Sequence, residues 1–311
     1  MTRSISKNTL HAWLAITAAT ALMTACGGDN NADVEIPETP TTPAVNTPNV
    51  NANKATRPEY ARLEMPRLHH GTDTVLIHKS AGDVVNYITE WDYKRKTLRW
   101  SCYVLDKAYL AQRTTRYYSD TNQYPQDPLI PTTLQWAEDP YYYNGQKLDH
   151  GHMCPSADRL SSAEANKQTF YLTNMQPQFN AFNAGIWAKL EKMVRTVAST
   201  ADTLYVCKGG TIDEGTWGGY NKIYRTLDNG LIVPRYFYMA LLRVNKGTYS
   251  AIAIWTDQVT NANDTGANMK QYAISVDELE NRTGIDFFCN LPDQTENAVE
   301  KTNSPGAWGL Y

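Results

Sequence analysis

The chain has 311 residues, a formal net charge of −3 and 20% charged residues. This balance excludes a broadly basic protein that coats nucleic acid, because such proteins need an excess of lysine and arginine to neutralise phosphates. The 20 tyrosines and 8 tryptophans indicate a body that is large and apolar enough to bury one core.

The first 26 residues predict a bacterial lipoprotein signal. Their apolar stretch, residues 14–23, is too short and too polar to span a membrane. The run Leu22-Met23-Thr24-Ala25-Cys26 resembles a lipobox, which would make Cys26 the acylated first residue of the mature protein. The alternative is an ordinary cleaved signal peptide and a soluble exported protein. A lipid on Cys26 would anchor the protein to the cell envelope, and Gly27, in place of aspartate, favours the outer membrane.

Residues 27–56 predict a disordered linker. The segment contains four prolines among Thr, Asn, Ala and Val, and it has no aromatic residue to bury. Residues 57–311 then form one predicted domain, because no second stretch of linker composition divides them.

Strand patterns dominate this domain, and one long helix interrupts them. The helix is indicated by apolar residues at the spacing of one helical face, from Ile186 to Val197. A second helix begins at a capping Ser275 and ends near Gly284. Predicted strands cover residues 74–78, 84–91, 98–105, 203–207, 235–242 and 250–255; residues 118–143 form a long irregular excursion, and 170–174 a short strand or loop. The fold class is therefore α+β, with a central antiparallel β-sheet flanked by helices.

The sequence does not decide whether the remaining cysteines form disulfides. Without Cys26 there are four, at positions 102, 154, 207 and 289, an even number that suits disulfides in an exported protein. Three pairings are possible, and buried free thiols are an equal alternative.

Positive charge is concentrated between Lys94 and Arg116, where seven cations face one anion, Asp106. Such a stripe on a near-neutral body could attract a polyanion. A solvated charged face is the alternative.

Reactive side chains are most concentrated in the stretch Asp149-His150-Gly151-His152. If it is extended, the two imidazoles point to the same side, because side chains alternate along a strand. Gly151 would allow close backbone approach between them. Two alternatives are a zinc site, with Asp149 or Asp158 as a further ligand, and a surface histidine pair without function.

This stretch resembles the Asp-Arg-Gly-His motif of the DNA/RNA non-specific endonuclease family, whose members have ββα-metal (His-Me finger) active sites. The resemblance extends from about Tyr60 to Asp293. The segments that carry it are residues 100–103, 149–159, 169–178, 183–191 and 283–288.

The resemblance implies a role for each matching position. His152 corresponds to the general base, Asn183 to the single protein ligand of the metal, and Glu191 to the carboxylate that binds water in the metal's shell. Asn174 and Arg195 correspond to accessory residues near the scissile phosphate. Two features depart from the family pattern. His150 replaces the usual arginine, and residues 117–126 obscure whether Arg113 or Arg116 is the upstream phosphate-binding arginine.

The chemistry of these side chains agrees with the implied roles. A neutral histidine accepts a proton near neutral pH, and an amide oxygen is a hard ligand suited to Mg²⁺, with Mn²⁺ as a substitute. On a continuous helix Glu191 would lie about 12 Å from Asn183, so that water could bridge it to the ion. The alternatives are a capping role for Asn183 and an i,i+4 ion pair between Glu191 and Arg195.

Three further residues of the motif are assigned structural roles. Asp149 and Asp158 are expected to order it by hydrogen bonds, and Cys154 is expected to be structural rather than nucleophilic. Asn174 could instead be a turn residue, because Pro177 follows it closely.

Together these observations predict a lipid-anchored, metal-dependent, sequence-nonspecific endonuclease that hydrolyses DNA and RNA to 5′-phosphate ends. Its expected partners are nucleic acid as substrate and a membrane through the lipid. Alternatives are a phosphodiesterase of the same scaffold acting on nucleotides or small diesters, and a non-catalytic surface-binding lipoprotein.

Overall fold

The computed structural model describes residues 49–311 except 55, 70–72 and 144. The predicted signal segment with Cys26, and the predicted linker up to residue 48, lie outside the described residues. In the part of the chain that is described, no helix has the length and apolarity to cross a bilayer.

The folded body starts earlier than composition indicated. Asn49 donates a hydrogen bond to the Cys289 carbonyl at 2.9 Å, and Asn53 donates one to the Pro66 carbonyl at 2.9 Å. Residues that we predicted to belong to a disordered linker are therefore bound to the domain. The predicted start at residue 57 is too late, because asparagine side chains fix this polar segment without burying apolar groups.

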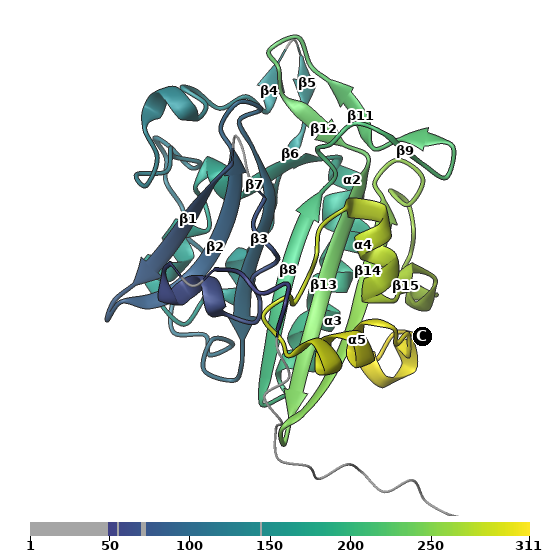
Figure 1. Cartoon of the computed structure of the whole chain (residues 1–311). Coiled ribbons are helices and arrows are strands. Elements are labelled where there is room, and N and C mark those ends of the chain that lie inside the picture. Colours follow the sequence, from purple (N-terminus) through teal and green to yellow (C-terminus); the bar gives the residue numbers. More distant parts are fainter. Residues whose placement is uncertain (1–48, 55, 70–72, 144) are drawn as a thin grey trace, which may run out of the picture. The chain divides into compact units, whose positions relative to one another are not determined.

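Seven strands form one sheet in the order β1-β2-β3-β8-β13-β14-β15, and every neighbouring pair is antiparallel (Figure 1). This confirms the predicted fold class. The strands are β1 (Asp73–Ser80), β2 (Val84–Asp92), β3 (Thr97–Leu105), β8 (Thr203–Gly210), β13 (Tyr236–Asn245), β14 (Thr248–Asp257) and β15 (Ala273–Ile274).

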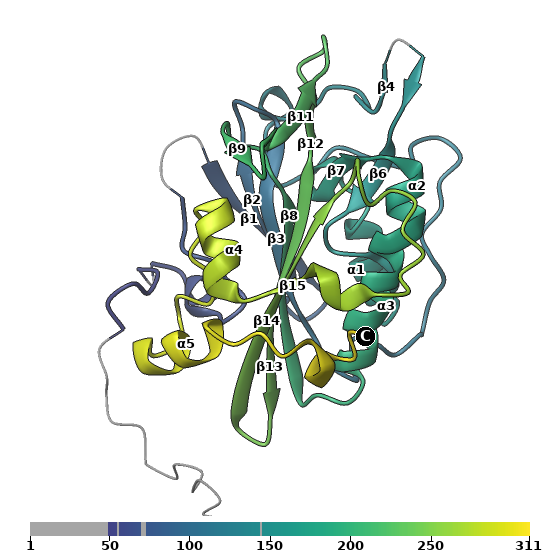
Figure 2. The same cartoon turned by 90° about the vertical axis from the view of Figure 1, so that its right-hand side faces the viewer.

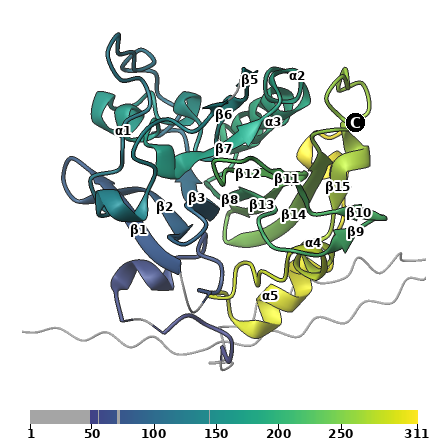
Figure 3. The ribbon, with the colours of Figure 1, turned by 90° about the horizontal axis from the view of Figure 1, so that it is seen from above.

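Helices cover the sheet on both faces, which Figures 2 and 3 show from the side and from above. One face carries α1 (Ala163–Gln168) and α3 (Ala188–Ala198), and the other carries α4 (Val276–Thr283) and α5 (Asp293–Glu300). Alternation along β13 builds both cores: Phe237 packs in the cluster that contains α3, and its neighbour Tyr238 in the cluster that contains α4.

The two predicted helices are present with the expected signals. The Ser275 hydroxyl accepts a hydrogen bond from the Glu278 N–H at 3.1 Å, and Gly284 ends α4 with a left-handed φ of 75°. In α3 the predicted apolar face, which includes Leu190 and Val194, is buried.

Asn183 is not on a continuous helix with Glu191. Between α2 (Asn180–Phe182) and α3 lies the π-helical segment η5 (Asn183–Trp187), and the chain kinks there at Gly185, with φ −92° and ψ −113°. The continuous helix on which we based their spacing is therefore not present.

A two-stranded ribbon precedes this kinked helix. Strand β6 (Asp149–His152) pairs antiparallel with β7 (Met175–Gln178), and His152 is opposite Met175. A Cβ atom at Gly151 would collide with the Gln178 side chain, so the glycine makes room for a side chain of the neighbouring strand. Ribbon and helix together make the predicted ββα arrangement.

The remaining elements are short. They are β4 (Tyr142–Tyr143), β5 (Gln146–Lys147), β9 (Thr216–Trp217), β10 (Tyr220–Asn221), β11 (Ile223–Thr226), β12 (Ile232–Pro234), and 3₁₀ turns at Pro58–Ala61, Thr132–Leu134, Ser156–Asp158, Leu172–Asn174, Met269–Tyr272 and Pro305–Trp308. The excursion 118–143 is irregular as predicted, apart from one such turn and β4. The segment at 170–174 is a turn that leads into β7.

The four cysteines at positions 102, 154, 207 and 289 are buried free thiols in the structure. Of the two alternatives, the structure supports the free thiols.

Candidate active site

A cleft of about 570 Å³ opens on the face of the sheet that carries α3. It brings together His152 from β6, Asn183 from η5 and Glu191 from α3. Arg116, from the irregular excursion, lines the same cleft. The ribbon and the kinked helix thus place in one cavity the base, the ligand and the carboxylate that the sequence predicted.

The imidazole of His152 is held in one tautomer. Its Nδ1 lies 3.1 Å from the His150 carbonyl oxygen, and only a protonated nitrogen can donate to a carbonyl. Nε2 is buried and has no hydrogen-bond partner among the described residues. Burial, reinforced by the charge of Arg116, lowers the pKa of His152 to about 3. The ring is therefore neutral at pH 7 and has a lone pair on Nε2.

Asn183 presents an amide oxygen to the cleft. Its Nδ2 donates to Asp149 Oδ2 at 2.9 Å, which fixes the orientation of the amide. No hydrogen bond within the described residues uses the Oδ1 atom. A neutral, hard oxygen that faces a polar cleft suits a hydrated divalent cation. The residues present therefore fit the metal that the sequence resemblance implies.

Glu191 is paired with a buried lysine. Lys208 Nζ lies 2.9 Å from Glu191 Oε1, and the Lys208 side chain is fully buried. Burial raises the pKa of Glu191, and the charge of Lys208 acts in the opposite direction. The ion pair fixes one carboxylate oxygen, so the other can accept hydrogen bonds from water in the cleft.

The structure distinguishes the two candidate arginines. Arg116 lines the cleft, and its guanidinium lies 4.7 Å from the Phe170 ring centroid. Phe170 in turn packs edge-on against His152, with 4.9 Å between ring centroids. Arg113 is exposed and does not line the cleft. Of the two candidates, Arg116 is therefore the arginine that the fold brings to the cleft beside His152.

Asn174, which was predicted to bind substrate, does not line the cleft. It is fully buried, and its amide is saturated by the backbone. Oδ1 accepts from the Cys154 N–H at 2.9 Å, while Nδ2 donates to the carbonyls of Cys154 and Thr169 at 2.9 and 2.8 Å. Asn174 instead holds the turn that follows β6, where burial raises the pKa of the Cys154 thiol to about 12 and leaves it inert.

Arg195 does not line the cleft either. Its guanidinium donates to Asp158 Oδ1 at 2.9 Å, and Tyr103 donates to the other oxygen of that carboxylate at 3.0 Å. The alternative ion pair with Glu191 is also wrong, because Asp158 takes this role. Arg195 is a positioning residue that fixes Asp158, and both aspartates of the motif order it as expected.

His150 forms part of the cleft wall. It is stacked between Tyr124 and Tyr141, with ring centroids 3.5 and 4.2 Å away, and its Nε2 lies 2.9 Å from Asp139 Oδ2. A flat imidazole thus fills the position of the family's usual arginine. No group of three close metal-ligating side chains in the described ranges includes His150 or His152, so the zinc alternative is not supported.

Two members of the basic stripe are paired with acids. Arg95 pairs with Asp92 at 2.9 Å, and the nearly buried Arg99 pairs with Asp73 at 2.9 Å. Arg116 is the member of the stripe that reaches the cleft. Four other members, Lys94, Lys96, Lys107 and Arg113, form no ion pair within the described residues, so the attraction of a polyanion by the stripe stays a prediction.

Sequence reasoning missed Lys208 and the wall formed by Asp139 and Tyr124. A signal for Lys208 was available: it follows Leu204 and Val206 at alternate positions of an apolar strand, which places it on the core face. No local pattern marks Asp139 and Tyr124, because the irregular excursion brings them to the cleft.

The comparisons with known proteins agree with this geometry. The family model for DNA/RNA non-specific endonuclease matches residues 76–294. Nuclease C1 of Cunninghamella echinulata is 30% identical over 57% of this chain and 70% of its own length, and a nuclease of Nostoc sp. is 26% identical over 69% and 75%.

A solved structure of an EndoG/EndoGI complex contains a chain with the same fold. Its TM-score is 0.60 at 23% identity, and the alignment covers 71% of this chain and 88% of that one. The family match spans more than half of the sequence and includes every residue of the cleft described above. The chain belongs to the DNA/RNA non-specific endonuclease family, a family of metal-dependent nucleases.

Proposed function

We propose that this protein is a Mg²⁺-dependent endonuclease that cleaves DNA and RNA without sequence preference and leaves 5′-phosphate ends. Mn²⁺ would replace Mg²⁺. The observation that carries the proposal is the pairing of two unused acceptors in one cleft: Nε2 of His152 and Oδ1 of Asn183.

His152 would act as the general base. Its Nδ1–H is fixed by the His150 carbonyl, so Nε2 accepts the proton of the attacking water. The His150 carbonyl thus fixes the orientation of the His152 ring, just as Asp149 fixes the orientation of the Asn183 amide.

Asn183 would hold the metal directly, and Glu191 would hold it through water. When bound, the cation supplies positive charge that stabilises the phosphate and the departing 3′ oxygen. The protein's own contribution is orientation: Lys208 fixes Glu191, and Asp149 fixes Asn183. The donors are oxygens, which favour Mg²⁺ or Mn²⁺ over zinc or copper.

Arg116 would bind a nonbridging oxygen of the substrate phosphate. A contact to the phosphate backbone carries no sequence information, which agrees with non-specific cleavage of both nucleic acids. Arg116 and His152 line the same cleft, so one phosphate could lie between them.

The direct test uses the whole chain with plasmid DNA and with a long RNA. Cleavage should require Mg²⁺ or Mn²⁺ and should stop with chelator. Intact nucleic acid after prolonged incubation with metal would contradict the proposal and favour a non-catalytic lipoprotein. Faster turnover of bis-nitrophenyl phosphate than of long DNA would favour a phosphodiesterase of small diesters.

Export and anchoring through Cys26 form a separate proposal, supported by the lipobox-like run alone. Radiolabelled palmitate should be incorporated into the wild-type chain and not into Cys26→Ser. Incorporation into both proteins, or into neither, would contradict the anchor without affecting the nuclease proposal.

A further inference from the structure

A second pocket lies on the opposite face of the sheet from the cleft. Helices α4 and α5 and the N-terminal segment line an open pocket of about 320 Å³. Every titratable side chain that lines it is acidic; they are Asp277, Glu280, Asp286, Asp293, Glu296 and Glu300.

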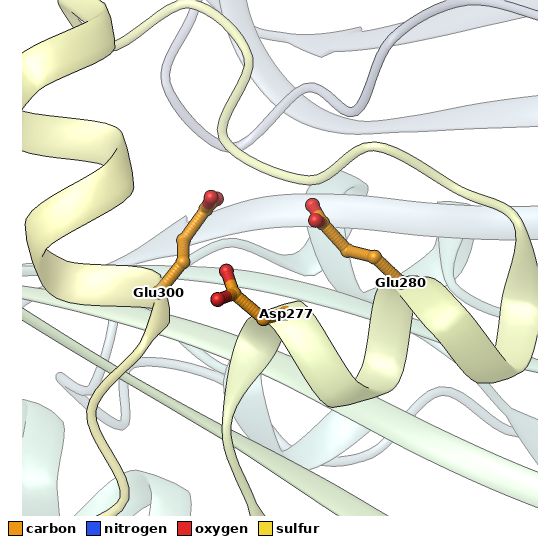
Figure 4. Close-up of side chains that lie close together, drawn as sticks. All are labelled: Asp277, Glu280 and Glu300. Carbon is orange, nitrogen blue, oxygen red and sulfur yellow. The ribbon is translucent and has the colours of Figure 1, made fainter.

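Three of these carboxylates converge, as Figure 4 shows for Asp277 and Glu280 from α4 and for Glu300 from the end of α5. One oxygen from each lies within 4.8 Å of the others. Oxygen ligands bound at about 2.4 Å to one calcium ion can be at most about 4.8 Å apart. The spacing therefore fits three ligands around a single ion.

The convergence is not explained by hydrogen bonds within the protein. Glu300 is only 5% exposed, yet its Oε1 has no hydrogen-bond partner among the described residues, and no hydrogen bond there involves the Asp277 side chain. Glu280 accepts one, from the Phe287 N–H at 2.8 Å. A buried carboxylate oxygen without a partner is costly, and it lines the same pocket as its two neighbours.

Within the described residues, no cation is paired with these three carboxylates. Across the described ranges, no lysine, arginine or histidine forms an ion pair with Asp277, Glu280 or Glu300. Arg67 reaches the rim, where it lies 3.8 Å from Asp286, and it is mostly exposed. Burial and the neighbouring acids raise the pKa of Glu280 to about 8 and that of Glu300 to about 10.

Asn51 adds a neutral oxygen to the pocket. Its Nδ2 donates to Glu296 Oε1 at 2.8 Å, while its Oδ1 is buried and has no partner among the residues described. Carboxylate and amide oxygens without nitrogen or sulfur donors are the ligand set of calcium.

We propose that Asp277, Glu280 and Glu300 form a calcium-type divalent cation site, separate from the catalytic cleft, that ties α5 to α4. The site is structural. The ion would also fix the N-terminal segment through Asn51, which interacts with the same acidic cluster. Extracellular calcium modules bind at about 10⁻⁴–10⁻³ M, so an exported protein would be loaded.

The test measures thermal unfolding of the whole chain with Asn183→Ala, so that the cleft's metal ligand does not contribute. After chelator treatment at pH 8, 5 mM CaCl₂ should raise Tm by on the order of 5 °C. The same concentration of MgCl₂ should raise it less. An unchanged Tm with CaCl₂ overturns the site, and a larger response to MgCl₂ overturns its assignment to calcium.

Two variants tie the response to these side chains. Glu300→Gln should lose the calcium increment and, in chelator, melt no lower than its parent, because a neutral amide replaces a carboxyl group that burial keeps protonated at pH 8. Glu214→Gln is the matched control, because Glu214 is exposed and does not line the acidic pocket. This variant should keep the full increment in Tm. If Glu300→Gln keeps the increment, the proposal is wrong.

Two further measurements complete the test. If Glu300→Gln does not fold, Asp277→Asn serves in its place with the same expected loss. In the otherwise wild-type chain, Glu300→Gln should leave Mg²⁺-dependent cleavage of DNA unchanged at 25 °C. This readout separates the calcium site from the proposed nuclease chemistry, since either can fail without the other.

Discussion

Each face of the sheet carries a pocket rich in oxygen atoms, and the two pockets differ in whether their polar side chains are paired with other side chains. In the cleft, Asn183 is bound by Asp149, and Glu191 by Lys208. In the acidic pocket, Asp277 and Glu300 have no partner among the described residues. In the catalytic cleft, a neighbouring side chain orients each of the two functional side chains and leaves one oxygen atom of each free to act. In the acidic pocket, these two carboxylates lack such a neighbour in the described part of the chain, which suits a site whose task is to bind a cation.

The comparison predicts the largest effect for the metal ligand of the cleft. Asn183→Ala should lower the cleavage rate at least 100-fold with little change in stability, because it removes the free amide oxygen. Asn180→Ala is the matched control: Asn180 also donates to Asp149, at 3.0 Å, but it does not line the cleft. Initial rates on plasmid DNA should fall for Asn183→Ala and stay near the wild-type value for Asn180→Ala. Equal losses in both variants would mean that the hydrogen bonds to Asp149, and not a metal ligand at Asn183, determine the rate.

Lys208→Met should destabilise the protein more than any single change in the acidic pocket. It leaves Glu191 buried without a counter-charge, which costs about 3–5 kcal/mol. Adding Glu191→Gln should recover part of the stability but none of the activity. Urea unfolding of both single variants and the double variant gives the coupling energy, and additive losses would contradict the ion pair.

Asn174→Ala should cost about 1–3 kcal/mol, because it leaves the Cys154 backbone groups and the Thr169 carbonyl without partners. Activity should fall only as the fraction of folded protein falls. A large loss of rate in protein that is fully folded by circular dichroism would restore Asn174 as a substrate contact.

The smallest effect is a pH dependence of stability to which the acidic pocket contributes a calcium-sensitive part. The folded-state pKa values of Glu280 and Glu300 are raised from the ordinary 4.5 to about 8 and about 10. Between these limits the folded state binds more protons than the unfolded state, so stability in chelator should fall as pH rises from 5 to 8.5.

Calcium should reduce this slope, because the ion replaces the protons, and Glu300→Gln should reduce it without calcium. Glu90, whose pKa burial raises to about 8, adds a slope that calcium does not change. Urea unfolding at several pH values, with and without CaCl₂, measures both. A slope that is identical in wild type and Glu300→Gln would show that the pocket does not titrate in this range.

The sequence allowed the fold class and the cleft's main residues to be predicted, for identifiable reasons. Alternating β-branched residues indicated the strands, and the spacing from Ile186 to Val197 indicated α3. His152, Asn183 and Glu191 were found because the family resemblance fixes their positions, and the structure brings them into one cleft. Their catalytic roles remain predictions.

Other features could not be predicted, because long-range packing decides them. Whether Arg113 or Arg116 faces the cleft depends on the path of an irregular segment. The saturation of Asn174 depends on the loop that follows β6. The kink at Gly185 has no marker beyond the glycine itself. The acidic pocket joins residues from positions 51 to 300, and nothing in the local pattern brings them together.

The most direct test of the central claim is the single-turnover cleavage rate of His152→Ala compared with that of His69→Ala, which removes an exposed imidazole that does not line the cleft. We predict that His152→Ala loses about 10²–10⁴-fold with Mg²⁺ present, recovers part of the rate with added imidazole, and that His69→Ala is unchanged. A full rate for His152→Ala would contradict the account.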